Sequence, residues 1–74
     1  MEDKVLEIIN TIRVSKGLDV LSSIQPENSL RDNFEFTSFD LAELTVRVED
    51  VFDIDIFENG IVNTIGEIYQ KLNQ

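Results

Sequence analysis

Apolar residues near the N-terminus recur at the spacing of one helix face. They stand at positions i, i+3, i+4 and i+7, which places their side chains on one side of an α-helix. Two acidic residues precede this stripe and two basic residues follow it, as the helix dipole favours, and Gly17 can cap the C-terminus. We therefore predict a first helix over residues 3–16. The stripe consists of Val5, Ile8, Ile9 and Ile12.

A second stripe with the same period begins near the middle of the chain. Thr37 can cap this helix at its N-terminus, and Asp40 follows three residues later, as in a capping box with Asp in place of the usual Glu or Gln. We expect the helix to end near Phe52 or Asp53. Its predicted core-facing residues are Leu41, Leu44, Val48, Val51 and Phe52.

The C-terminal segment predicts a third helix. Thr64 and Glu67 form a good capping box, ahead of an apolar face made of Ile65, Ile68, Tyr69 and Leu72. Between the second and third helices, residues 53–57 alternate polar and apolar positions, which predicts a short extended segment with Ile54 and Ile56 turned inward. Residues 60–63 then form either a loop or a short helical turn, which would be a fourth helix.

A long connection, residues 17–37, separates the first two helices and shows no sustained period. It contains seven large apolar residues, too many to remain in water, so we expect it to fold back and pack, with one helical turn near Ser29–Asp32. The 74 residues form one domain, 1–74. The predicted fold class is all-α: a small three- to four-helix bundle with a long first loop.

Composition narrows the possible chemistry. The chain has no Cys and no His, so it lacks a thiolate, the commonest metal ligand and the usual general base. Its net charge is −9, and residues 35–58 hold eight acidic residues and one basic one. Such a surface disfavours nucleic acid and favours basic partners. No apolar run is long enough to span a membrane, and we expect a cytoplasmic monomer.

Calcium binding and self-contained catalysis both fit the sequence poorly. If Asp53 opened an EF-hand loop, Phe57 would stand at position five, Glu58 would replace the turn glycine and Thr64 the final Glu. A chain of this length also has little room for an enclosed active-site pocket. Ser38 has no base near it in sequence to activate its hydroxyl.

The start of the second helix offers two further features. Ser38 can be a helix cap, a role for which Thr37 competes, or it can carry a group. Phe39, Ala42 and Val46 form an apolar strip outside the core stripe, and it is flanked by four acids: Asp40, Glu43, Glu49 and Asp50. The strip either binds a basic partner with an apolar centre or packs over the loop while the acids simply solvate the helix.

From residue 29 onward the chain resembles the acyl carrier protein family. The resemblance lies in Ser29-Leu30, in Phe36 to Leu44, in Val48 to Ile56 and in Asn63 to Ile68. The hallmark of that family is Asp-Ser-Leu or a near variant, and here it reads Thr37-Ser38-Phe39. Glu35 stands where many members have Gly.

The resemblance implies that Ser38 receives a 4′-phosphopantetheine arm from coenzyme A, attached by a separate phosphopantetheinyl transferase. The chain would then be a carrier, not an enzyme: it would hold acyl groups as thioesters and present them to partner enzymes with basic docking patches. The resemblance also implies that the apolar strip and the acidic residues around it form the partner-binding face. The acyl cargo would lie near Leu44, Val48 and Ile65. The departure at Thr37 favours a dedicated pathway at least as much as fatty-acid synthesis.

Two alternatives to an acyl carrier stay open. One is an aminoacyl carrier that is loaded by an AMP-forming ligase. The other is an unmodified acidic docking module of the same fold, in which Ser38 only caps the helix.

Overall fold

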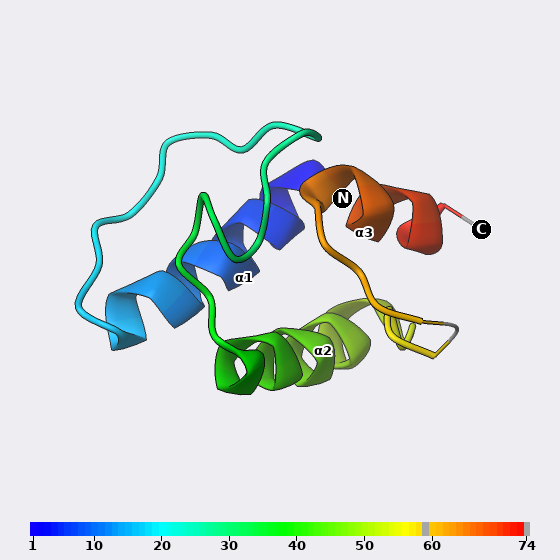
Figure 1. Cartoon of the computed structure of the whole chain (residues 1–74). Coiled ribbons are helices and arrows are strands. Elements are labelled where there is room, and N and C mark those ends of the chain that lie inside the picture. The colour runs from blue at the N-terminus through cyan, green and yellow to red at the C-terminus, as the bar shows by residue number, and fades with distance from the viewer. Residues whose placement is uncertain (59, 74) are drawn as a thin grey trace.

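Three helices make up the regular structure of residues 1–58 and 60–73, the part of the chain described by the computed structural model. They are α1 (Glu2–Ser15), α2 (Ser38–Phe52) and α3 (Ile65–Leu72). The α1 helix packs against α2, and the long first loop arches over α1 and α3 on the side away from α2 (Figure 1). The all-α prediction is confirmed. The possible short helix at residues 60–63 is not formed, since these residues are a bend followed by irregular backbone.

The C-terminus of α1 ends at a left-handed glycine. Gly17 has a φ of 81°, its N–H donates to Val14 O, and the Leu18 N–H donates to Arg13 O at 2.9 Å. These two bonds form a Schellman motif, which satisfies carbonyls that the helix leaves without partners. The predicted cap at Gly17 is confirmed, and the helix spans the predicted residues to within one position at each end.

The N-terminus of α2 is closed by the predicted capping box. The Asp40 N–H donates to Thr37 Oγ1 at 3.3 Å, and the Thr37 N–H donates to Asp40 Oδ2 at 2.8 Å. Such reciprocal bonds satisfy two N–H groups that the first helical turn leaves without partners. Thr37 is therefore the N-cap and Ser38 is the first helical residue, so the helix start does not depend on the Ser38 hydroxyl. At the other end, Asp53 caps α2 in the left-handed region.

The hydrophobic core joins all three helices to the first loop. Its members are less than 10% exposed: Val5, Ile8, Ile9, Ile12, Leu30, Phe34, Phe36, Leu41, Leu44, Val48, Ile56, Val62, Ile65 and Ile68. The expected packing of the loop is confirmed, since Leu30, Phe34 and Phe36 belong to this core. Val51 was predicted to be in the core and is instead exposed, because it stands at the edge of the buried face in the last turn of α2. Ile56 is fully buried as predicted, whereas Ile54 is only half-buried.

Polar side chains of α1 hold the first part of the loop in place. The Asn10 side chain bonds both backbone groups of Leu21, at 2.7 and 2.9 Å. The buried Arg13 guanidinium donates to the carbonyls of Asp19 and Phe34. Arg13 is one of the two basic residues after the first apolar stripe, for which the sequence predicts only an interaction with the helix dipole. Its main contacts are instead with two loop carbonyls, which is how a buried guanidinium meets its hydrogen-bonding needs.

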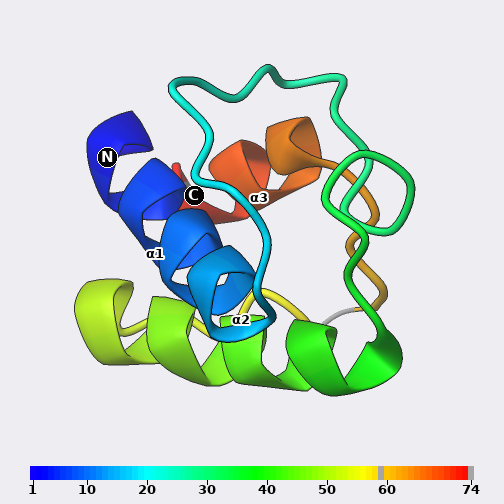
Figure 2. The ribbon, with the colours of Figure 1, turned by 90° about the vertical axis from the view of Figure 1, so that its left-hand side faces the viewer.

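The second part of the loop pairs with the start of α3. The Leu30 N–H donates to Asn63 O at 2.9 Å, and the Gly66 N–H donates to Pro26 O at 2.8 Å. A Cβ at Gly66 would lie 3.1 Å from that Pro26 oxygen, so this close approach favours glycine. Seen from the side, the loop meets the segment before α3 above the N-terminal end of α2 (Figure 2). The segment that precedes Ser38 is thus tied to the rest of the fold.

Replacing Glu35 with glycine is expected to stabilise the protein. Glu35 is exposed and has a φ of 61°, a conformation that costs an ordinary L-residue about 1–2 kcal/mol. Part of the gain is offset by the greater freedom of glycine in the unfolded chain, so we expect Glu35→Gly to raise the free energy of unfolding by about 0.5–1 kcal/mol in urea titrations. Glu35→Ala removes the same charge but keeps the Cβ. A gain of the same size in that variant would contradict the backbone explanation.

Candidate functional site

Ser38 presents its hydroxyl to solvent at the first position of α2. The residue is exposed, while Leu41, one turn later, is anchored in the core. The backbone of Ser38 is fixed by the capping box of the neighbouring Thr37. Ser38 is thus an accessible hydroxyl on a rigid support.

The hydroxyl has one side-chain partner among the described residues. Arg31 Nη2 donates to Ser38 Oγ at 3.0 Å. A guanidinium stays protonated and can only donate, so it cannot accept the hydroxyl proton. Among the described residues, no side chain that could accept this proton contacts Ser38 Oγ, and a serine nucleophile requires such a base.

The apolar strip predicted on α2 lies exposed beside Ser38. Phe39 is 79% exposed and Val46 is 65% exposed, and Ala42, between them in sequence, is exposed as well. Phe39 therefore does not fold over the loop. Large exposed apolar side chains that cluster on one helix face are typical of a protein-binding surface. Ile61, 76% exposed, was not singled out from the sequence, because a single isoleucine in an irregular segment gives no periodic signal.

Three acidic residues flank this strip. Glu49 and Asp50 are exposed, and within the described residues no base lies within ion-pairing distance of either. Glu43 Oε2 accepts from Arg47 Nε at 2.8 Å, one helical turn away. The negative charge of the strip is therefore concentrated on Glu49 and Asp50. We call Phe39, Ala42, Glu43, Val46, Glu49 and Asp50 the α2 face.

Asp40 was predicted to belong to this acidic rim, and the structure places it elsewhere. Its exposed fraction is 5%, and its carboxylate pairs with Lys16 Nζ from the C-terminal end of α1. The same oxygen accepts from the N–H and the hydroxyl of Thr37. Asp40 is therefore a structural link between α1 and α2 and is not available to a partner. The sequence could not reveal this link, because Lys16 lies 24 residues away.

Burial and hydrogen bonding act in opposite directions on Asp40. Burial by itself would raise the pKa of the carboxyl. The hydrogen bonds from Lys16 and Thr37, together with the positive charge of Lys16, outweigh burial and hold the pKa of Asp40 below its ordinary value of 3.8. Asp40 is therefore ionised at neutral pH, as its pairing with Lys16 requires.

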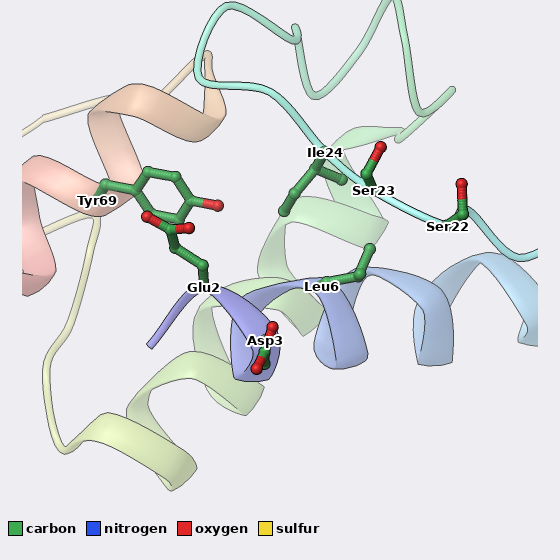
Figure 3. A pocket seen from close by; sticks show the side chains of 7 residues that line it. All are labelled: Glu2, Asp3, Leu6, Ser22, Ser23, Ile24 and Tyr69. Carbon is green, nitrogen blue, oxygen red and sulfur yellow. The ribbon is translucent and has the colours of Figure 1, made fainter.

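A shallow cavity of about 160 Å³ lies between the N-terminal part of α1, the first loop and α3. Figure 3 shows Leu6, Ile24 and Tyr69 converging on it from these three elements, with the Glu2 carboxylate beside the Tyr69 ring. Burial and the charge of Glu2 raise the pKa of the Tyr69 hydroxyl. This cavity lies near the start of α1. Ser38 lies near the other end of α1, where Lys16 contacts Asp40. The cavity is therefore remote from the Ser38 hydroxyl.

The residues expected to surround an apolar cargo are closely packed in this structure. Leu44, Val48 and Ile65 each have an exposed fraction of zero. They belong to the core that α1, α2 and α3 share. A cargo tail at this place would have to displace core side chains from one another.

The surroundings of Ser38 fit a phosphopantetheine arm. Its hydroxyl is exposed, so the arm can extend into solvent, and it opens a helix, whose N-terminal end favours negative charge. Arg31 adds a positive charge beside Ser38 Oγ. The residue before Ser38 is the neutral Thr37, which would bring no carboxylate toward a phosphate bonded to Ser38 Oγ.

Comparisons with known proteins add no assignment to these observations. None of the helices in residues 1–58 and 60–73 combines the length and hydropathy that crossing a bilayer requires. No protein-family model matches the chain, and no solved structure matches it significantly.

Proposed function

We propose that this protein is a carrier that holds acyl groups on a 4′-phosphopantetheine arm attached to Ser38 and presents them to partner enzymes. The observation that carries the proposal is the exposed Ser38 hydroxyl at the start of α2, directly beside the exposed α2 face. The resemblance of Thr37-Ser38-Phe39 and its surroundings to acyl carrier proteins supports the same assignment. The carrier would serve the biosynthesis of lipids, of polyketides or of another specialised product.

The attachment reaction uses Ser38 as the nucleophile and coenzyme A as the donor. A bond forms between Ser38 Oγ and the β-phosphorus of coenzyme A, and the pyrophosphate bond to the α-phosphorus breaks. Adenosine 3′,5′-bisphosphate leaves, and the hydroxyl proton passes to a base of the transferase, because no described residue of this chain places a base on Ser38 Oγ. When bound, the arm supplies a terminal thiol that holds the acyl group as a thioester.

The α2 face is suited to brief binding of partner enzymes. The exposed Phe39 and Val46 give a small apolar centre, and Glu49 and Asp50 supply negative charge around it. Charge of this kind speeds association with a basic partner, while a small apolar contact allows rapid release. A carrier that visits several enzymes in turn needs both properties.

The test is the intact mass of the protein before and after incubation with coenzyme A and a broad-specificity phosphopantetheinyl transferase. The expected result is a gain of one phosphopantetheine, located by peptide mapping on the peptide that contains Ser38. No gain in a protein whose circular dichroism shows it folded would favour the unmodified docking module. Loading with an amino acid by an AMP-forming ligase would identify the aminoacyl carrier.

The contribution of the α2 face can be tested by a matched pair of substitutions. Val46→Ala removes apolar surface from the face, and we expect it to lower kcat/KM of the transferase about fivefold, the effect of roughly 1 kcal/mol of lost binding energy. Val14→Ala makes the same change at a 56% exposed position of α1, and we expect no effect. Equal kcat/KM values for the two variants would contradict a role for the α2 face in transferase binding.

A further inference from the structure

Arg31 stands out among the charged residues because it contacts a serine and not an acid. Its Nη2 donates to Ser38 Oγ at 3.0 Å. Although the chain has fifteen acidic residues and six basic ones, no carboxylate lies within ion-pairing distance of Arg31 in the described part of the chain. Arg13 also lacks an acidic partner in the described residues, but it is buried and donates to two backbone carbonyls. Arg31 is exposed and contacts only a neutral hydroxyl, so its charge is available to another anion.

The backbone that carries Arg31 is held on both sides. The residue lies in a turn in which the Asn33 N–H donates to Ser29 O at 2.9 Å and the Asp32 N–H donates to Ser29 Oγ. This single turn is the one predicted near Ser29–Asp32. On one side of Arg31, Leu30 is fully buried, and three residues later Phe34 is buried as well. The turn therefore fixes the base of the Arg31 side chain relative to α2.

We infer that Arg31 binds the phosphate joined to Ser38 Oγ and so orients the first part of the arm. This inference rests on the proposed function. Phosphorus would be bonded directly to Oγ, and its two free oxygens would lie one bond further out, within reach of a guanidinium that already contacts Oγ. These oxygens carry the negative charge of the phosphodiester, and the planar donors of arginine match a pair of phosphate oxygens.

The consequence is a directed arm. A phosphodiester held only through Ser38 Oγ can rotate about every bond of the serine side chain. A second contact through Arg31 limits that rotation. It therefore reduces the number of directions in which the arm leaves the surface beside the α2 face. Partner enzymes that bind this face would then meet the arm at a more constant position.

The first test places a phosphate on Ser38 without any transferase, by incorporating phosphoserine at position 38. The ³¹P resonance of this protein is titrated with pH to obtain the second phosphate pKa, which is ordinarily near 6. We expect the pKa to be higher in Arg31→Gln by about 0.5 unit, because the neighbouring positive charge stabilises the dianion. Arg31→Lys should restore part of the difference. Arg47→Gln removes one positive charge from α2, nine residues after Ser38, and should leave the second pKa of the phosphoserine unchanged.

The second test uses the protein after modification by coenzyme A and the transferase. Arg31→Gln should still gain the phosphopantetheine mass, but its ³¹P chemical shift should differ from that of the wild type. The wild-type shift should change with salt concentration, and the Arg31→Gln shift should not. Identical phosphoserine pKa values and identical ³¹P shifts in wild type and Arg31→Gln would overturn the inference. Failure of the wild type to gain mass, with the phosphoserine difference intact, would overturn the carrier function while leaving the Arg31–phosphate contact established.

Discussion

Ser38→Ala is expected to take up no phosphopantetheine under conditions in which the wild type is fully modified. Alanine lacks the oxygen that forms the bond to phosphorus, so the loss should be complete and not a reduced rate. Intact mass measured over time gives the result directly. Ser23→Ala, a change at another exposed serine, is the matched control and should be modified at the wild-type rate.

The same variant separates attachment from helix capping. Thr37 and Asp40 form the capping box without Ser38, and alanine is a good helix former. We therefore expect the free energy of unfolding of Ser38→Ala to stay within about 0.5 kcal/mol of wild type. A mass gain in Ser38→Ala would place the attachment on another residue, and a large loss of stability would show that the hydroxyl is structural.

Ser38→Ala should also leave binding to the transferase nearly unchanged. The α2 face that we propose for this contact does not include Ser38, and its apolar members lie exposed in their own right. The dissociation constant of the unmodified complex, measured by calorimetry, should therefore stay within about twofold, which is roughly 0.4 kcal/mol. A pure docking module would likewise bind its own partner equally well with and without Ser38→Ala, but its wild type would gain no phosphopantetheine mass.

Asp40→Ala is expected to give the largest loss of stability among the variants considered. It removes a buried carboxylate that accepts from Lys16 and Thr37, and so takes away both the capping box and a link between α1 and α2. Loss of a helix cap costs about 1 kcal/mol, and breaking a buried ion pair by removing one partner costs more, reduced here because Lys16 can still reach water. We expect a total of about 2–3 kcal/mol, or about 10–20 °C in Tm.

Two further substitutions give this prediction its controls. Asp40→Asn keeps an oxygen for the Thr37 N–H but loses the charge, so we expect about half the loss seen in Asp40→Ala. Asp50→Ala removes an exposed acid from the same helix and should change stability by no more than about 0.5 kcal/mol. A wild-type Tm in Asp40→Ala would show that the Lys16–Asp40 pair contributes nothing to the fold.

The stability of the protein should also depend on pH through Asp40. The pKa of this carboxyl is lower in the folded protein than its ordinary value of 3.8, so the folded state binds this proton less readily than the unfolded state. The stabilisation is therefore complete above about pH 4–5 and is lost as the pH falls through the lower, folded pKa. The difference in unfolding free energy between wild type and Asp40→Asn should shrink over this acidic range. A constant difference would contradict the assignment.

The sequence predicted the local structure well because local signals decide it. The three helices, the capping box at Thr37 and Asp40 and the glycine cap of α1 all depend on residues a few positions apart. The exposed strip of Phe39, Ala42 and Val46 follows from the same helical period, which leaves these three residues outside the buried stripe. Ser38 could be selected for the same reason, since its place at a helix start is a local property.

The tertiary structure alone decided the roles of charged side chains that act across the fold. Asp40, which looked like an exposed acid, is buried against Lys16, and Arg13 bonds two carbonyls of the first loop. The contact of Arg31 with Ser38 belongs to the same class, since it depends on how the loop returns to α2. The periodicity of a sequence records which side of a helix is apolar, but a charged residue obtains its partner from chain packing. The sequence by itself therefore determined the helices and the exposed serine, and packing determined which charges hold the fold and which one lies beside that serine.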